Sequence, residues 1–264
     1  MVDKEIIFIA VTYGNTTLSF EDLLVQMRQF SLVIVNNKSS TKPTRDIKFQ
    51  ENAINIKYIQ AKNNFGYGGG VNLGVKYALE KGAEWVVVMN QDLKVTKKGV
   101  EALDKILQKN PPGIVGPFAG GLDPKRWTTM LPSDHVDYIS GACMAIHRDV
   151  IEKVGYFYEL YFMYYEDADY CVRAKKAGFP LIHASIAGIQ HDDSPSLGKG
   201  SFLHEYYLAR NHLLFVERLA PAWVKLYEYL RLPKTIAEFI SSKNQGGLAG
   251  VGDYFLHRFG EKNV

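Results

Sequence analysis

The sequence predicts an α/β protein with a mainly parallel central sheet flanked by helices and followed by a C-terminal helical extension. Three observations support this. Apolar runs alternate with segments of helical periodicity over residues 1–110, which is typical of a parallel sheet. The runs contain almost no polar residues, as expected for strands covered on both faces. From Ser201 onward the pattern is helical and rich in Tyr, Arg and Lys.

The expected elements of the first part follow one another as strand, helix, strand, strand, helix, strand and helix. A first helix is expected to begin at a capping Ser19 and to repeat apolar residues up to Phe30. Residues 113–132 contain several Gly and Pro and are expected to be irregular, with order resuming at 136–148. The strands are expected at residues 6–11, 32–35, 54–59 and 85–89, and the two further helices at 71–80 and 97–109.

The composition is that of an ordinary globular protein. Of the 264 residues, 47% are apolar and 22% are charged, which excludes a collagen-like or disordered chain. The formal net charge of +3 offers no bulk electrostatic reason to expect a nucleic-acid partner. Two cysteines without a CxxC pattern disfavour a disulfide scaffold and a zinc–thiolate site. No signal-peptide pattern and no membrane-spanning apolar run is present, so we expect a cytoplasmic protein.

Polar residues at the expected strand ends are the first candidates for a ligand site. In parallel sheets, ligands bind beyond the carboxyl ends of the strands. A glycine-rich run over 63–74 fits neither the dinucleotide fingerprint nor the phosphate loop. Either a loop that contacts a ligand or a plain strand-to-helix turn explains it, and we favour the loop. The strand-end candidates are Thr12, Tyr13, Asn36, Asn37, Asn64, Asn90, Gln91 and Asp92.

An aromatic run leads directly into three carboxylates, Glu166, Asp167 and Asp169, at an expected helix start. The helix dipole favours acids there, and Asp169 is spaced to pair with Arg173. The dipole does not explain the aromatic residues, whereas a carboxylate between aromatic walls suits a general base.

Two later segments add weaker candidates. His191 follows an apolar segment, and a neutral imidazole there is a candidate metal ligand. Tyr207 and Arg210 lie one helical turn apart, where phosphate contact and a plain surface helix both remain open.

Taken in order, these segments resemble the family 2 glycosyltransferases of the GT-A fold, and the bacterial rhamnosyltransferase-like members in particular. The resemblance implies a GT-A domain over 1–215, with a nucleotide-binding half (1–110), an acceptor-binding half (111–215) and a helical extension over 216–264. The matching segments are Val11-Thr12-Tyr13, residues 35–40, residues 64–72, Ser140-Gly141-Ala142, Glu166-Asp167-x-Asp169, His191 and Tyr207-x-x-Arg210-Asn211.

The resemblance implies an inverting transfer of a sugar from a nucleotide-diphosphate donor. Asp167 would take the acceptor proton, and Glu166 would help to shape that site. Asp92 matches the last position of the family's metal-binding DxD, whose first position is Asn90 here, and His191 would be the second ligand of a divalent cation, Mg²⁺ or Mn²⁺. The residues expected to bind the nucleotide sugar are Thr12, Tyr13, Asn36, Asn64, Gly68, Gly69, Asn72, Asn90, Gln91, Asp92, Tyr207 and Arg210.

The implied acceptor is a glycan or a polyprenyl-linked glycan of bacterial cell-surface polysaccharide synthesis, with rhamnosyl transfer as one option. Residues 220–259 mix aromatic, basic and apolar side chains, a mixture compatible with peripheral contact with the inner face of the cell membrane. A helical lid or an oligomer surface, as in a homodimer, explains the same mixture. Two other functions stay open. A nucleotidyltransferase would need a basic loop that residues 12–18 lack, and Asn90 slightly favours a non-catalytic nucleotide-sugar-binding module.

Overall fold

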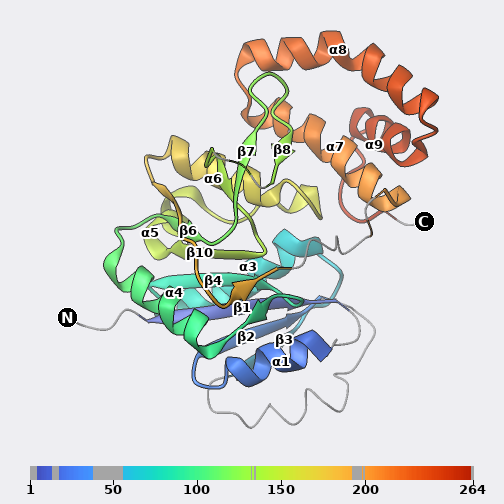
Figure 1. Cartoon of the computed structure of the whole chain (residues 1–264). Helices are drawn as coiled ribbons and strands as arrows, with labels where there is room; N and C mark the ends of the chain where they lie inside the picture. The colour runs from blue at the N-terminus through green and yellow to red at the C-terminus, as the bar shows by residue number, and fades with distance from the viewer. Residues whose placement is uncertain are drawn as a thin grey trace.

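A computed structural model of the chain describes residues 5–13, 18–37, 56–131, 133, 135–191, 198 and 200–262 (Figure 1). Its centre is a seven-stranded sheet with the strand order β11-β6-β10-β4-β1-β2-β3. β1 to β4 run parallel, β10 is antiparallel to both of its neighbours, and β11 is parallel to β6. The strands are β1 (Ile6–Thr12), β2 (Ser31–Asn36), β3 (Ile56–Gln60), β4 (Trp85–Asn90), β6 (Ile114–Gly116), β10 (Cys143–His147) and β11 (Leu181–His183).

Helices cover both faces of this sheet, as the uninterrupted apolar strands predicted. Along β1, Ile7 and Ile9 face α3 (Gly66–Glu80), while Phe8 and Ala10 face α1 (Leu18–Gln26) and α4 (Lys97–Lys109). This alternation follows from the two-residue period of a strand. The remaining helices of this part are α5 (Arg148–Val154), the short 3₁₀ helix η1 (Glu159–Tyr161) and α6 (Glu166–Lys176).

The strand register brings the predicted strand ends to one edge of the sheet. Thr12 of β1 pairs with Asn36 of β2, and Val11 pairs with Asn90 of β4. The carboxyl ends of three parallel strands therefore meet there. A small ribbon of β5 (Lys94–Val95) and β12 (Ile189–Gln190) brings two distant parts of the chain together at the same edge.

Several boundaries differ from those predicted. Ser19 falls inside α1 and does not precede it, whereas α4 has the predicted bounds 97–109. Residues 113–132 are not irregular throughout, since β6 is followed there by a β-hairpin. That hairpin pairs β7 (Ala119–Leu122) with β8 (Thr129–Met130), and β7 also pairs with β9 (Tyr138–Ile139). Of the segments that carried the resemblance, residues 38–40 lie outside the described part of the chain.

The glycine-rich run is helical, because α3 begins at Gly66 and not near Val71. Gly66 has a φ of +71°, and a Cβ there would overlap the carbonyl oxygen of Phe162. A Cβ at Gly74 would come within 2.6 Å of Ile9 Cγ2. The glycines therefore let α3 lie close to β1 and to the loop that precedes α6.

Three helices form the C-terminal layer: α7 (Phe202–Leu219), α8 (Ala222–Ser241) and α9 (Gln245–Phe255). α7 continues across the expected boundary at 215/216, and α9 packs along it. After α9 the chain returns toward the sheet (Figure 1). Among the described residues, no helix combines the length and apolarity needed to span a bilayer.

Candidate active site

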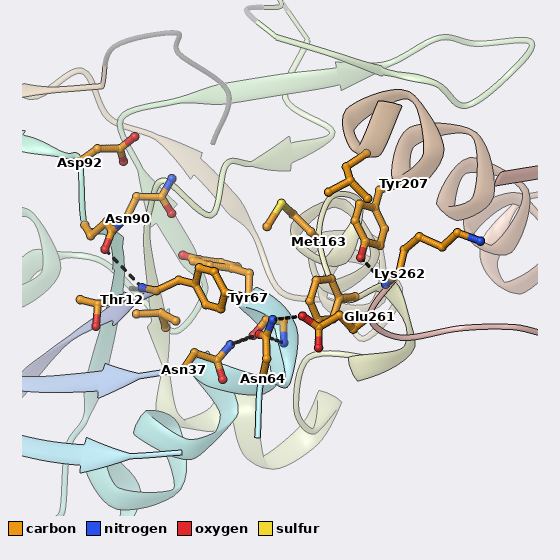
Figure 2. A pocket seen from close by; sticks show the side chains of 16 residues that line it. Thr12, Asn37, Asn64, Tyr67, Asn90, Asp92, Met163, Tyr207, Glu261 and Lys262 are labelled. Atoms are coloured by element: carbon orange, nitrogen blue, oxygen red, sulfur yellow. Dashed lines mark hydrogen bonds between the residues drawn. The ribbon is translucent and has the colours of Figure 1, made fainter. Parts of the chain in front are cut away.

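A cavity of about 320 Å³ opens where the carboxyl ends of β1, β2 and β4 meet (Figure 2). α7 and the C-terminal segment close its other side. The backbone N–H of Tyr13 donates to Gln91 Oε1 at 3.4 Å, which joins the ends of β1 and β4. The predicted donor-binding residues that line the cavity are Thr12, Tyr13, Asn64, Asn90, Gln91, Asp92 and Tyr207.

Asn37, rather than Asn36, presents its side chain to this cavity from the end of β2. The Asn36 side chain is buried beside the cavity and donates from Nδ2 to Gln60 Oε1 at 3.1 Å. Asn37 Nδ2 donates to the Gly66 carbonyl at 2.6 Å and to Asn64 Oδ1 at 3.2 Å. Neighbouring residues of a strand point to opposite sides, so only one of these two amides can face the ligand.

Gly68, Gly69 and Asn72 lie inside α3 and do not line the cavity. Asn72 Nδ2 donates to the Phe157 carbonyl at 2.9 Å, and the Phe157 N–H donates back to Asn72 Oδ1 at 2.9 Å. Asn72 therefore holds the segment before α6 against α3. Direct contact with the donor is not supported for Gly68, Gly69 or Asn72.

Arg210 is also not a cavity residue, contrary to the expected phosphate contact. Its side chain is buried, and all five of its N–H groups have acceptors within the protein. The shortest of these bonds reach the carbonyls of Tyr161 at 2.8 Å and Gly260 at 2.9 Å. Arg210 thus ties α7 to η1 and to the C-terminal segment, and no donor is left for a phosphate.

That C-terminal segment supplies two cavity residues that no pattern in the sequence indicated. Glu261 Oε1 accepts a hydrogen bond of 2.7 Å from Asn64 Nδ2. The backbone N–H of Lys262 donates to the Tyr207 hydroxyl at 2.8 Å, and its Nζ donates to Asp253 Oδ2 at 2.7 Å. Figure 2 shows Glu261 and Lys262 beside Asn64 and Tyr207 on one wall. The helical extension therefore completes the cavity.

Asp92, on the opposite wall, contacts His191, which lies 99 positions further along the chain and does not itself line the cavity. His191 Nε2 lies 3.3 Å from Asp92 Oδ1 and 3.3 Å from Asn90 Nδ2. The β5–β12 ribbon produces this meeting, because Lys94 pairs with Gln190. Burial raises the pKa of Asp92, but the hydrogen bond and charge of His191 outweigh it and leave the pKa below its ordinary value. Asp92 is therefore a carboxylate at neutral pH.

This pair fits a divalent cation that takes its other ligands from a substrate. Within the described ranges, no three His, Cys, Asp or Glu side chains gather as a metal site. One carboxylate and one imidazole are too few to enclose an ion by themselves. Mg²⁺ commonly binds through one or two carboxylates together with substrate phosphates and water. The residues present are consistent with that mode.

Glu166 and Asp167 begin α6 in a buried setting. Asp167 Oδ2 accepts from the Gly141 N–H at 3.0 Å, and Oδ1 accepts from the Ala168 N–H at 2.8 Å. Burial raises the pKa of Asp167, while these backbone donors oppose the rise. Burial and then the charge of Asp167 raise the pKa of Glu166 to about 8, and Glu166 Oε2 has no partner. The arrangement favours a protonated Glu166, while the backbone donors favour the charged form of the neighbouring Asp167.

Asp167 does not itself line the cavity, whereas Tyr67 does. The Tyr67 hydroxyl donates to the Gly141 carbonyl, and its ring borders the cavity. Burial first, and then the charges of Glu166, Asp167 and Asp92, raise the pKa of Tyr67. Tyr67 therefore keeps its proton, close to the acid pair. The only sequence signal for it was an aromatic residue inside the glycine run.

Asp169 has a structural role. As predicted, it pairs with Arg173, with Oδ1 and Nε 2.6 Å apart. Its other oxygen accepts from Arg218 Nε at 3.2 Å and from the Tyr161 hydroxyl at 3.0 Å. A fully buried carboxylate with these partners anchors α6 to α7 and η1.

Two curated proteins are similar to this chain over most of its length. It is 29% identical over 205 residues to the low-salt glycan biosynthesis hexosyltransferase Agl10 of Haloferax volcanii, which covers 69% of this chain and 66% of that protein. It is 28% identical over 232 residues to the N-acetylglucosaminyl-diphospho-decaprenol L-rhamnosyltransferase of Mycobacterium tuberculosis, which covers 72% and 74%. The chain thus spans about two thirds to three quarters of these relatives' length.

Solved structures share the fold at low identity. The mannosyltransferase PcManGT from Pyrobaculum calidifontis, solved with GDP-Man and Mn²⁺, matches with a TM-score of 0.62 at 13% identity, over 96% of this chain and 88% of that one. S. aureus TarS 1-349 in complex with UDP-GlcNAc matches with a TM-score of 0.61 at 15% identity, over 95% and 80%. Both are glycosyltransferase structures, and this likeness confirms the predicted GT-A fold.

The family comparison covers more than half of the chain. Residues 15–173 match the family described as Glycosyl transferase family 2. This range includes the ends of β2 and β4 at the cavity and both carboxylates at the start of α6, whereas the end of β1 lies just before it. Together with the hexosyltransferase and rhamnosyltransferase relatives, it confirms the predicted resemblance. The chain therefore belongs to glycosyl transferase family 2.

Proposed function

We propose that this protein transfers a hexosyl group, with rhamnosyl as the first choice, from a nucleotide-diphosphate donor to a hydroxyl of a lipid-linked glycan, with inversion at the anomeric carbon. One observation carries the proposal. Gly141 binds Asp167 through its N–H and Tyr67 through its carbonyl, and the Tyr67 ring lines the same cavity as Asp92 of the Asp92–His191 pair. An inverting displacement needs a base and a stabilised leaving group on opposite faces of the sugar.

Asp167 is the proposed base. Its two backbone hydrogen bonds fix the carboxylate and oppose the rise in its pKa that burial causes, next to a protonated Glu166. The acceptor oxygen forms the new bond to the anomeric carbon as the bond from that carbon to the diphosphate oxygen breaks. The acceptor proton passes to the Asp167 carboxylate. Because Glu166 is neutral, it places no second negative charge beside the Asp167 carboxylate.

Asp92 and His191 are the proposed protein ligands of Mg²⁺ or Mn²⁺. The cation would supply positive charge beside the departing diphosphate. Asn90, in contact with His191, orients the imidazole. The mannosyltransferase PcManGT, of the same fold, was solved with GDP-Man and Mn²⁺, which is consistent with this assignment.

Thr12, Tyr13, Asn37 and Asn64 are the proposed contacts of the nucleoside, since they line the cavity beyond β1 and β2. The Tyr13 side chain is 55% exposed, so its ring presents an accessible face on which a base can stack. The relative from M. tuberculosis is named for a decaprenol-linked acceptor and a rhamnosyl group. A lipid-linked acceptor would bring this protein to the inner face of the cell membrane.

A donor screen tests the proposal. The purified chain is incubated with Mn²⁺, a polyprenyl-diphosphate glycan and, in turn, dTDP-rhamnose, UDP-GlcNAc or GDP-mannose, and release of the nucleoside diphosphate is measured with product mass. One donor should give acceptor-dependent release and a product heavier by one sugar. Asp167→Asn should abolish transfer while donor affinity by calorimetry stays unchanged, and Asp22→Asn on the exposed side of α1 is the matched control.

Three results would count against it. Donor binding without transfer to any acceptor would favour the binding-module alternative. Formation of a nucleotide sugar from a sugar phosphate would favour the nucleotidyltransferase. Near-wild-type turnover of Asp167→Asn would show that another group is the base.

A further inference from the structure

One face of α8 exposes large apolar side chains that nothing in the described chain covers. Trp223, Leu226, Leu230 and Ile240 are 56%, 60%, 74% and 62% exposed. Residues 223, 226, 227, 230, 234 and 237 recur at the spacing of a single helix face. The opposite side of α8 is packed, with Val224 fully buried. Figure 1 shows α8 in the layer farthest from the sheet.

The charge on this exposed face is positive. α8 has two carboxylates, and both are engaged: Glu228 Oε1 lies 2.8 Å from Arg126 Nε, and Glu238 Oε2 lies 3.2 Å from Arg231. Neither Lys225 nor Lys234 has a carboxylate partner among the residues that the structure describes. The exposed face thus combines Trp, Tyr and Leu side chains with the uncompensated Lys234, while Lys225 lies on the flank of α8, two residues after Trp223.

We propose that this face of α8 docks on the surface of an anionic lipid bilayer. A helix that sits at a bilayer interface presents aromatic and aliphatic side chains to the acyl boundary and basic side chains to the headgroups. The purpose of this contact rests on the proposed transfer to a lipid-linked acceptor, but the contact itself does not require that activity.

α8 is held rigidly enough to orient the domain on such a surface. The ion pair between buried Glu228 and half-buried Arg126 joins it to the turn between β7 and β8, with two bonds of 2.8 and 3.3 Å. Docking through α8 therefore fixes the whole fold relative to the bilayer and does not merely tether it.

A second copy of the chain fits the exposed face of α8 less well than a lipid surface does. A twofold dimer places the same patch of each protomer against its partner. Here such a contact would set the uncompensated lysines of one copy against those of the other. Anionic headgroups supply the missing negative charge, so the lipid surface matches the charge as well as the apolar area.

Vesicle flotation of the full chain tests the proposal without donor or acceptor. Vesicles of phosphatidylcholine alone are compared with vesicles containing phosphatidylglycerol, at low and high salt. The chain should float with the anionic vesicles and be released by salt. Leu230→Glu and the double change Lys225→Glu/Lys234→Glu should each weaken binding roughly tenfold or more. The matched control Lys98→Glu, on the exposed side of α4, should bind as the wild type does.

Activity measurements separate this proposal from the proposed function. Leu230→Glu should keep wild-type turnover on a detergent-solubilised acceptor and lose it on an acceptor embedded in anionic vesicles, with unchanged thermal unfolding. Absence of flotation on anionic vesicles, or equal flotation of Leu230→Glu, overturns the docking surface. A wild-type dimer that Leu230→Glu dissociates, without vesicle binding, identifies a second copy as the occupant and also overturns it. Flotation without any transfer leaves the docking surface standing and contradicts the proposed function.

Discussion

Tyr67 and Asp167 are positioned by the same residue, Gly141. The Tyr67 hydroxyl donates to the Gly141 carbonyl, and the Gly141 N–H donates to Asp167 Oδ2 at 3.0 Å. A Cβ at position 141 would lie 3.1 Å from Tyr67 Cε1 and 3.6 Å from Asp167 Cβ, so a glycine leaves room for both. The cavity wall and the proposed base are thus coupled through one residue.

Tyr67→Phe should lower turnover roughly 5- to 20-fold, as expected for the loss of one hydrogen bond that positions the base. Donor KM should change little, because the ring still lines the cavity. Steady-state kinetics on the best donor measure both values, with Tyr156→Phe, an exposed tyrosine, as the control. A rise in KM at constant kcat would show that Tyr67 binds the donor and does not position Asp167.

Glu166→Gln should stabilise the fold more as pH rises from about 4.5 to about 8. The ordinary pKa of this carboxyl is 4.5, and burial with the Asp167 charge raises it to about 8 in the fold. Between these values the folded state keeps a proton that the unfolded chain has lost, so wild-type stability falls as pH rises. Gln keeps the uncharged state at every pH.

Urea unfolding of the wild type and Glu166→Gln at pH 5, 6, 7 and 8 measures this difference. Each unit of pKa shift corresponds to about 1.4 kcal/mol, so the gain at pH 8 should reach a few kcal/mol at most. A gain that does not vary across this range would mean that Glu166 titrates near its ordinary value in the fold.

Asn90→Asp should reduce the Mn²⁺ concentration needed for half-maximal activity, because it adds a carboxylate beside the Asp92–His191 pair. Asp92→Asn should raise that concentration by one to two orders of magnitude (roughly 10- to 100-fold). Metal titrations of transfer activity give both numbers, and Asp104→Asn on α4 serves as the control. Equal Mn²⁺ dependence in all three variants would place the cation elsewhere or exclude its need.

Arg210→Lys should destabilise the protein by about 2–4 kcal/mol, since Lys has three donors and cannot reproduce the five bonds of the guanidinium. The freed C-terminal segment should also raise donor KM, because Glu261 and Lys262 line the cavity. Urea unfolding and donor calorimetry report the two effects, with exposed Arg28→Lys as the reference. If Arg210→Lys unfolds at the same urea concentration as the wild type but binds the donor more weakly, Arg210 contacts the donor phosphate, as the sequence first predicted.

Local pattern was enough to predict much of this protein. Apolar runs predicted β1 and β4, and the helical periodicity of residues 97–109 predicted α4. The expectation that ligands bind beyond the carboxyl ends of parallel strands selected Asp92, Thr12 and Asn64, which line the cavity. These features depend on neighbours in the chain: a two-residue or 3.6-residue period and the polarity of a strand end. The Asp169–Arg173 pair was predictable for the same reason, because one helical turn joins them.

The tertiary structure alone decided which polar groups face the cavity. Asn36 and Asn37 have the same chemistry, and the side on which each leaves β2 separates them. Arg210 donates hydrogen bonds to backbone carbonyls that lie 49 and 50 residues away in the chain. Glu261 accepts a hydrogen bond from Asn64, 197 residues earlier. The family segments and their order were readable along the chain. Which residues line the cavity was determined by the direction of each side chain and by the return of the C-terminal segment to the sheet. Both depend on packing between elements that are far apart in the sequence.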